Sequence, residues 1–309
     1  MDILHTIVDL AQYVKTAVTP YLGRQDSKNS AGKTESGDEE FLIDEVAEHA
    51  IDEYLRKRDI SVAYYSEGRG LVETGCWPEH LLIIDPIDGT RPAMVGLEGG
   101  VVSIAAAPYT KDARMRDVTD ACILELKSGR LYTALKGGCV KIREKDRNLP
   151  VDTTLLTDLD RMSWSYEIAG RPISLITGAL SPLINRSSIQ GGVFTINSTA
   201  FSLTRLVSGQ FDAVVDVGNR ILRDRPSLRD QFVSAGLGKP IGLFPYDIAA
   251  ALLIVKVAGC SATDAYGNSL DDVLLLDTSE ANISSLVAAS NPMLHEQLLA
   301  EVDQGIQNI

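Results

Sequence analysis

The chain has 309 residues, and its 45% hydrophobic and 23% charged residues are an ordinary globular composition that excludes disorder as a description of the whole. The net charge of −13, from 29 basic and 42 acidic residues, argues against broad binding to nucleic acids or anionic membranes, which need clustered positive charge. The longest apolar run, residues 248–255, is too short to span a bilayer, and no basic signal-peptide region is visible. The four cysteines form no CxxC pair, so we expect reduced thiols and a cytoplasmic protein.

The first half of the chain predicts two helices followed by strands. Apolar residues at helical spacing predict amphipathic helices over residues 4–22 and 41–55. Residues 23–40 contain no large apolar side chain and predict a loop, which is either a solvated connector or an active-site flap. Beyond this loop, β-rich runs predict strands at residues 62–66, 81–84, 101–107, 121–126 and 130–134.

The second half of the chain predicts strands that alternate with helices. We expect strands at residues 173–177, 211–217 and 286–290, and helices at residues 199–208, 246–258 and 292–303. Such alternation is typical of α/β architecture. The sequence therefore predicts an α/β fold with an amino-terminal α+β half, residues 1–150, and a carboxyl-terminal α/β half, residues 151–309.

One carboxylate of the helix predicted at 41–55 lies in an unusual place. At 100° per residue, Asp44 falls within the apolar sector of this helix. A buried carboxylate needs a hydrogen-bond or cationic partner. Asp44 is therefore either a satisfied carboxylate at the helix start, where the helix dipole favours it, or a functional group.

The most informative stretch is Asp85-Pro86-Ile87-Asp88-Gly89-Thr90, which directly follows an apolar strand. Pro86 and Gly89 favour a tight turn, and Thr90 is a good N-cap for a short helix whose amides can bind phosphate. Carboxylates repel phosphate unless cations intervene, and oxygen-only ligands suit Mg²⁺. The stretch is therefore either a phosphate and magnesium site or merely a favourable turn.

Four motifs, in this order along the chain, resemble those of the inositol monophosphatase superfamily, which includes fructose-1,6-bisphosphatase-like members. They are Asp44, Ser66-Glu67-Gly68, Asp85-Pro86-Ile87-Asp88-Gly89-Thr90 and Tyr246-Asp247-Ile248-Ala249-Ala250. Asn197-Ser198-Thr199-Ala200 and Ala258-Gly259-Cys260 extend the resemblance over nearly the whole chain. The resemblance implies a layered α-β-α-β-α sandwich, magnesium dependence and a homodimer.

The implied activity is hydrolysis of a small phosphate monoester, an inositol phosphate or a sugar phosphate, by a metal-activated water. One alternative is a 3′-phosphonucleotide phosphatase, which would need a base-stacking aromatic side chain at the mouth of the site. The other alternative is a non-catalytic binding or regulatory protein that keeps the fold.

The resemblance also implies roles for individual residues. Two or more Mg²⁺ ions would be held by Glu67, Asp85, the Ile87 carbonyl, Asp88 and Asp247. The amides of Gly89 and Thr90 would bind phosphate, while Asp44, Glu67 and the Thr90 hydroxyl would take part in catalysis. Asp88, Ser198, Thr199 and Asp216 would contact the organic part of the substrate.

The sequence departs from the family pattern in four places. Gly68 replaces the second Glu of a Glu-Glu pair, Arg91 replaces a small residue, and Tyr246 replaces Trp. The segment 217–245 is long and net positive. We interpret it either as a surface excursion or as a substrate-facing insertion in which Arg223 and Arg225 bind a second anionic group.

Overall fold

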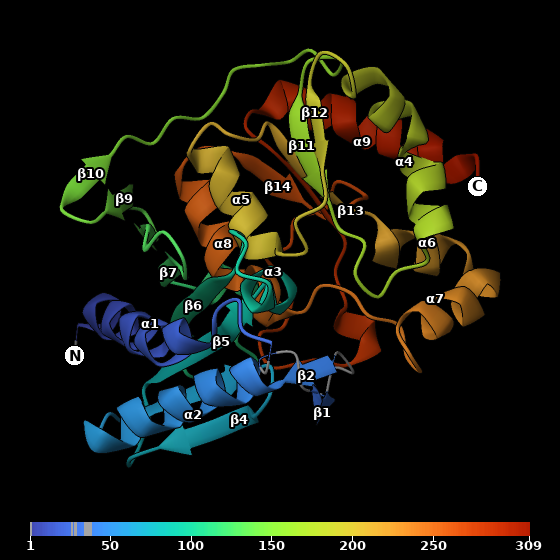
Figure 1. Cartoon of the computed structure of the whole chain (residues 1–309). Helices are drawn as coiled ribbons and strands as arrows, with labels where there is room; N and C mark the ends of the chain where they lie inside the picture. The colour runs from blue at the N-terminus through green and yellow to red at the C-terminus, as the bar shows by residue number, and fades with distance from the viewer. Residues whose placement is uncertain (1, 26, 28–29, 34–38) are drawn as a thin grey trace.

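Two sheets of unequal size organise the fold in the computed structural model, which describes residues 2–25, 27, 30–33 and 39–309 (Figure 1). The larger sheet has eight strands in the order β10-β9-β8-β7-β6-β5-β3-β4, and the smaller has five in the order β12-β11-β13-β15-β14. The strands of the larger sheet are β3 (Val62–Ser66), β4 (Gly70–Thr74), β5 (His80–Asp88), β6 (Val101–Pro108), β7 (Asp120–Glu125), β8 (Leu131–Leu135), β9 (Val140–Glu144) and β10 (Arg147–Leu149). Those of the smaller sheet are β11 (Ser163–Tyr166), β12 (Gly192–Phe194), β13 (Ala213–Asp216), β14 (Ser261–Thr263) and β15 (Leu286–Ala289).

Two amino-terminal helices, α1 (Ile3–Val18) and α2 (Leu42–Lys57), cover the outer face of the larger sheet (Figure 1). Asp2 caps α1 by accepting a hydrogen bond from the His5 N–H at 3.1 Å. The apolar faces of the helices, including Leu10 and Ile51, pack with Leu82 of β5 in one buried cluster. Burial of these faces, rather than helix propensity, holds both helices in place.

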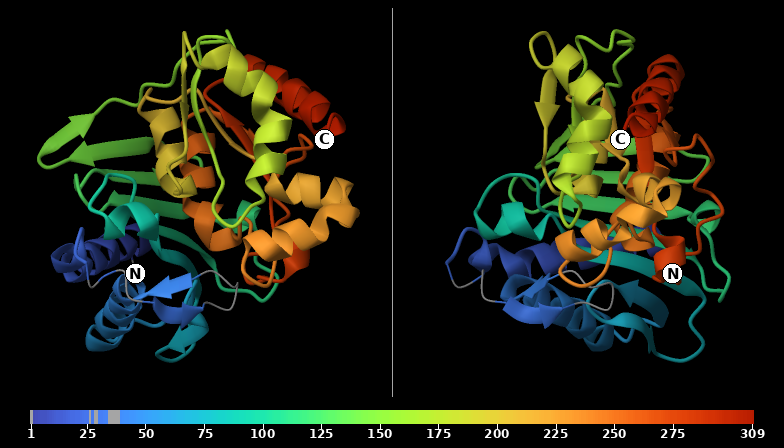
Figure 2. Two further views of the ribbon diagram at one scale, coloured as in Figure 1. Left: turned by 45° about the vertical axis from the view of Figure 1, so that its right-hand side comes forward. Right: turned by 90° about the vertical axis from the view of Figure 1, so that its right-hand side faces the viewer.

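Helices α5 (Thr199–Val207) and α8 (Pro245–Val257) lie between the two sheets. All residues of α5 are buried, and α8 is apolar around most of its circumference, as expected for helices covered on both sides. Helices α4 (Ile173–Ser187) and α9 (Pro292–Gln307) pack on the outer face of the smaller sheet (Figure 1 and Figure 2). The predicted α-β-α-β-α layering is confirmed.

The remaining elements are short. The helix α3 (Thr90–Met94) follows β5, while α6 (Gly218–Asp224) and α7 (Arg229–Ala235) occupy the long segment 217–245. Single 3₁₀ turns lie at Thr19–Tyr21, Met115–Asp117, Pro226–Leu228 and Glu280–Asn282. In the described residues, no helix is both long and apolar enough to cross a membrane.

Two predicted elements differ from the structure. The strand predicted at 173–177 is wrong, because these residues form the first turns of α4. The β-branched run suggests a strand, but Ile176, Leu180 and Leu183 recur at helical spacing and bury one face. Within the predicted loop 23–40, the backbone forms an antiparallel pair of strands, β1 (Ser30–Lys33) and β2 (Glu39–Phe41). The interpretation of this loop as an active-site flap stays a prediction, because much of the loop lies outside the described residues.

The change from one sheet to the other falls between Leu149 and Ser163, close to the division expected at residue 150. A division into two domains stays a prediction, since one buried cluster joins Ile83 of the larger sheet to Val214 of the smaller.

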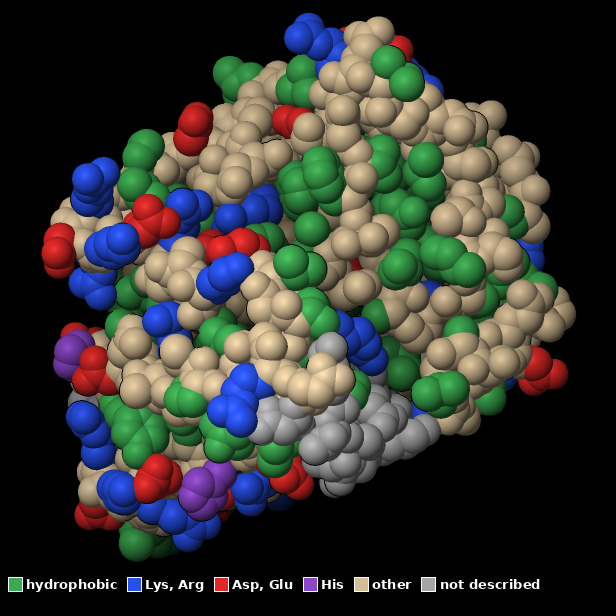
Figure 3. Space-filling model, viewed as in Figure 1, with side chains coloured by type: hydrophobic (Ala, Val, Ile, Leu, Met, Phe, Trp, Pro, Cys, Tyr) green, Lys and Arg blue, Asp and Glu red, His purple; other side chains and the backbone are tan. Residues whose placement is uncertain are grey.

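On the face shown in Figure 3, basic and acidic side chains are mixed over the β9–β10 hairpin, as is usual for a solvated surface.

Candidate active site

The turn after β5 brings the predicted phosphate motif into one short loop. The pairing of β5 with β6 shifts register between Asp85 and Asp88, so the strand bends where its carboxylates project. Gly89 has φ +86°, and a Cβ there would lie 2.4 Å from the Gly99 carbonyl oxygen. Only glycine therefore fits, and it is Gly89, rather than the predicted Thr90, that stands at the N-cap of α3.

The Thr90 hydroxyl has another task than capping. It lies 2.9 Å from Asp44 Oδ1 and 3.0 Å from the Ile87 carbonyl oxygen, and donates its hydrogen to these acceptors. The other oxygen of Asp44 accepts the Phe41 N–H at 2.9 Å at the start of α2. The apolar position of Asp44 on its helix is thus explained by a partner at each carboxylate oxygen.

Asp85 and Asp88 are buried, with exposed fractions of 2% and 7%. Burial raises the pKa of Asp85 well above its usual value, and the charges of Glu67, Asp88 and Asp247 add to this effect. Burial also raises the pKa of Asp88 to about 6, although hydrogen bonds from Ser198 and the Ala200 N–H, at 2.9 and 2.5 Å, oppose the shift. Keeping both carboxylates ionised and buried side by side costs free energy, and a bound cation would reduce this cost.

Two further carboxylates face this turn from other parts of the chain. Glu67 follows β3, which pairs in parallel with β5, so the ends of both strands lie side by side. Asp247 lies in the first turn of α8 and accepts the Phe244 N–H at 2.6 Å, which fixes its position. Both side chains are half-buried and line the same pocket.

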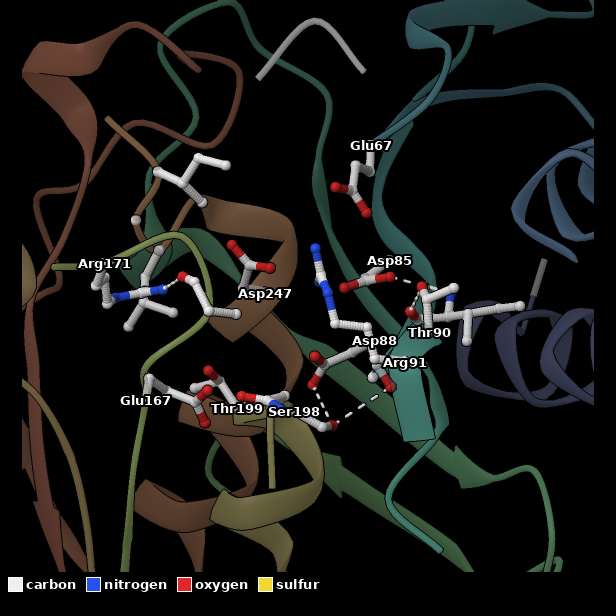
Figure 4. Close-up of a pocket in the computed structure, with 17 residues that line it drawn as sticks. Glu67, Asp85, Asp88, Thr90, Arg91, Glu167, Arg171, Ser198, Thr199 and Asp247 are labelled. Atoms are coloured by element: carbon white, nitrogen blue, oxygen red, sulfur yellow. Dashed lines mark hydrogen bonds between the residues drawn. The ribbon is translucent and has the colours of Figure 1, made fainter. Parts of the chain in front are cut away.

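The pocket is lined by 17 residues (Figure 4). Its amino-terminal wall consists of the lining residues from Glu67 to Arg91, and its carboxyl-terminal wall of those from Glu167 to Asp247. Five carboxyl groups and two guanidinium groups line it, a net charge of −3 when all are ionised. Without cations, a pocket of this charge would repel phosphate.

The donor set of the pocket fits a hard divalent cation. Glu67, Asp85, Asp88 and Asp247 supply carboxylate oxygens and the Ile87 carbonyl is nearby, while no His or Cys lines the pocket. In the described part of the chain, no three acidic, His or Cys side chains converge tightly enough to form a preformed metal cluster.

Asp216 does not line the pocket, although the sequence predicts a contact with substrate there. Its carboxylate is 1% exposed and accepts two hydrogen bonds from the Arg171 guanidinium, one of them at 3.1 Å from Nε. The Gly218 N–H, at 2.9 Å, also binds it. Asp216 thus holds Arg171, and Arg171 is the member of this pair that lines the pocket.

Glu167 is the main residue that sequence reasoning missed. It directly follows β11, and its side chain is 4% exposed at the pocket wall. Burial raises the pKa of Glu167 to about 8, while Arg171 opposes and Asp216 supports the shift. The position of Glu167 directly after a strand that pairs with β13 could have identified it as a site residue. This signal was not usable, because the strand at 163–166 was itself not predicted.

Ser198 and Thr199, for which the sequence predicts a contact with the organic part of the substrate, line the pocket at the amino-terminal end of α5. The Ser198 hydroxyl both accepts the Phe201 N–H at 3.3 Å and donates to Asp88, so it joins the helix cap to the carboxylate cluster. Arg91, a departure from the family pattern, also lines the pocket, and its side chain points toward the carboxylates in Figure 4.

The expected contact of Arg223 and Arg225 with substrate is not supported. Arg223 donates to the Ala281 carbonyl at 2.9 Å, and Arg225 to the Ile306 carbonyl at 3.3 Å, away from the pocket. From this segment, the pocket lining includes only residues 241–243, at its carboxyl-terminal end. These contacts agree with the interpretation of segment 217–245 as a surface excursion whose arginines have partners within the protein.

Residues 2–307 match the model of the inositol monophosphatase family. The chain is 30% identical over 291 residues to the fructose-1,6-bisphosphatase/inositol-1-monophosphatase of Methanocaldococcus jannaschii, covering 93% of this chain and 94% of that protein. It is 28% identical over 302 residues to the protein of the same name from Methanothermobacter thermautotrophicus, covering 96% and 95%. Among solved structures, Thermotoga maritima IMPase TM1415 has the same fold, with a TM-score of 0.70, 20% identity and 99% of each chain covered.

Proposed function

The chain belongs to the inositol monophosphatase family, and we propose that it is a magnesium-dependent phosphatase that hydrolyses a small polyhydroxylated phosphate monoester. The observation that carries this proposal is the convergence of Glu67, Asp85, Asp88 and Asp247 in one pocket beside the Asp44–Thr90 pair. A binding protein without turnover has no need of this pair next to an anion site.

Four carboxylates and one carbonyl would hold the metal ions. We infer that Glu67, Asp85 and the Ile87 carbonyl serve one ion, and that Asp85, Asp88 and Asp247 serve a second. Bound Mg²⁺ supplies charge neutralisation of the phosphate and acidifies a water molecule. With all five carboxyl groups ionised, two divalent ions would change the pocket charge from −3 to +1, and with Glu167 protonated the charge would be +2; either value suits a phosphate dianion.

The chain's own groups orient the attacking water. The Thr90 oxygen has a lone pair available for a water proton while its own hydrogen is directed to Asp44 and Ile87. Asp44 can then take the Thr90 proton, because its Oδ1 is only 2.9 Å away. First-turn amides of α3, which have no partner inside the helix, would bind the phosphate oxygens.

The lining favours a hydroxylated organic group over a nucleotide. None of the 17 lining residues, all of them described, is aromatic, so the pocket offers no ring on which a base can stack. Arg91 and Arg171 line the two walls and suit an additional phosphate better than a neutral ring. The similar proteins named fructose-1,6-bisphosphatase/inositol-1-monophosphatase support both inositol phosphates and sugar bisphosphates as substrates.

We also propose that the protein is a cytoplasmic homodimer. The four cysteines are free, with Cys76 and Cys139 exposed, which agrees with a reducing compartment. The dimer follows from the family resemblance, and light scattering coupled to gel filtration tests it, with a monomer as the contrary result.

Phosphate release from a panel of esters tests the proposed activity. The panel contains inositol 1-phosphate, fructose 1,6-bisphosphate and a 3′,5′-bisphosphonucleotide, each with Mg²⁺ and with EDTA. We expect release from the first two with Mg²⁺ only. Release from the nucleotide alone would favour the phosphonucleotide alternative, and release from none would favour a binding protein.

A further inference from the structure

The carboxyl-terminal wall of the pocket contains buried oxygens that lack hydrogen-bond partners. Among the described residues, four buried side-chain polar atoms have no partner: Ser103 Oγ, Ser165 Oγ, Glu167 Oε1 and Asn197 Oδ1. Two of these residues, Glu167 and Asn197, line the pocket. A buried acceptor without a partner costs free energy, so its occurrence in a ligand pocket indicates a place where the ligand supplies the missing hydrogen bond.

Glu167 is fixed where such a ligand group would lie. Its backbone N–H donates to the Val215 carbonyl at 3.1 Å, which extends the pairing of β11 with β13. Its carboxyl oxygen Oε1 is buried and has no hydrogen-bond partner. The nearby Arg171 guanidinium does not take this place, because it donates to Asp216 and to the Ala169 carbonyl.

The two walls also differ in their relation to the reaction. The Asp44–Thr90 pair that orients the water lies on the amino-terminal side, and Glu167 lies across the pocket from Thr90 (Figure 4). Attacking and leaving oxygens stand roughly in line across phosphorus, so the leaving group projects away from the water. The organic part of the ester therefore extends toward Glu167.

We propose that Glu167 is a specificity-determining residue whose Oε1 binds a hydroxyl group next to the ester oxygen of the substrate. This inference rests on the proposed phosphatase function and names the group that selects polyol phosphates. Asp216, which was expected to contact the organic part, cannot do so while Arg171 occupies its carboxylate. An ester without the neighbouring hydroxyl leaves Oε1 without a hydrogen bond, so Glu167 would not raise kcat/KM for that ester.

The test compares glycerol 2-phosphate with isopropyl phosphate, which has the same carbon skeleton without hydroxyl groups. Glu167→Leu should lower kcat/KM for glycerol 2-phosphate at least about tenfold more than for isopropyl phosphate, because only the first ester loses a hydrogen bond. Glu167→Gln keeps the shape and an acceptor, so it should retain most of the preference. Equal losses on both esters, or no loss on either, would overturn the assignment.

Ser165→Ala is the matched control, because it removes another unpartnered buried oxygen on β11 from outside the pocket. Ser165→Ala should change kcat/KM equally for the two esters. If it lowered kcat/KM for glycerol 2-phosphate selectively, as expected for Glu167→Leu, the effect would belong to the strand rather than to Glu167. Calorimetric binding of both esters in Ca²⁺ gives a readout besides turnover. If wild-type protein binds both esters but hydrolyses neither with Mg²⁺, the proposed function fails, while a preference lost only in Glu167→Leu still supports the role of Glu167.

Discussion

The two walls of the pocket are assembled in different ways. The amino-terminal wall takes most of its groups from one turn, Asp85 to Arg91, in which backbone and side chains are adjacent in sequence. The carboxyl-terminal wall takes its groups from the ends of β11, α5 and α8. On the proposed function, the reaction chemistry would reside mainly in a local motif, while substrate selection would depend on segments that meet only in the folded chain.

Asp247 belongs to the carboxyl-terminal wall but is proposed to share a metal ion with Asp85 and Asp88 of the amino-terminal wall, so its substitution should have the largest effect. Asp247→Asn keeps an acceptor for the Phe244 N–H but removes a charge that would face a metal ion. We expect kcat to fall at least about 10³-fold with the fold intact, since metal-assisted charge stabilisation is worth several kcal/mol. Steady-state kinetics at saturating Mg²⁺ measure this, and near-native kcat would contradict the metal assignment.

Within the amino-terminal wall, Thr90→Val should lower kcat by roughly 10²-fold with a smaller change in KM, because we propose that its hydroxyl acts on the water and not on the substrate. Asp44→Asn should behave similarly while keeping the Phe41 cap. Since the two groups act through one hydrogen bond, the double variant should lose little more than either single one. Additive losses would mean that they have separate roles.

The pH dependence of the stability of the metal-free protein should distinguish the two walls, because each contains a buried carboxyl group with a raised pKa, Asp88 in one and Glu167 in the other. Asp88 and Glu167 have pKa values raised to about 6 and about 8, so the folded state binds more protons than the unfolded state. The free energy of unfolding should therefore fall as pH rises from about 4 to 8, by about 3 kcal/mol for Asp88 alone.

Urea denaturation in EDTA between pH 4 and 9 measures this dependence. Asp88→Asn should remove mainly the part of the slope below about pH 6, and Glu167→Gln should remove the part that continues to about pH 8. A stability that is flat or rises with pH over this interval would show that neither carboxyl group is held in its neutral form.

The backbone of the amino-terminal turn offers a cleaner comparison. Gly89→Ala places a Cβ 2.4 Å from the Gly99 carbonyl oxygen, whereas Gly259, at φ +87°, has no atom within 4 Å of a built Cβ. Both variants carry the strain of a positive φ, and only the first adds a clash. Gly89→Ala should therefore be less stable than Gly259→Ala by about 2 kcal/mol in chemical denaturation, and equal losses would contradict the close approach.

The smallest effect is expected in the segment 217–245. Arg223→Ala and Arg225→Ala should change KM less than about twofold for a monophosphate or a bisphosphate, because both guanidinium groups donate to backbone carbonyls outside the pocket. A rise in KM confined to the bisphosphate would restore these arginines as substrate ligands.

The amino-terminal wall was largely predictable from the sequence. The turn, its glycine and the pairing of Asp44 with another group follow from residues that are close in sequence or from helical spacing. The N-cap was misassigned, because Gly89 and Thr90 both favour that position and only the observed φ distinguishes them. The strand predicted at 173–177 failed because short β-branched runs occur in helices as well as in strands.

The sequence by itself determined the fold class, the carboxylate-rich turn and the order of the family motifs, because these depend on local backbone preference and on ordered spacing. Only the tertiary structure decided that Arg171 binds Asp216, that Arg223 and Arg225 bind carbonyls elsewhere, and that Glu167 is buried in the pocket. The physical reason is that a charged side chain selects among all partners within a few ångströms. Those partners, and the burial that raises a pKa, come from segments far apart in sequence.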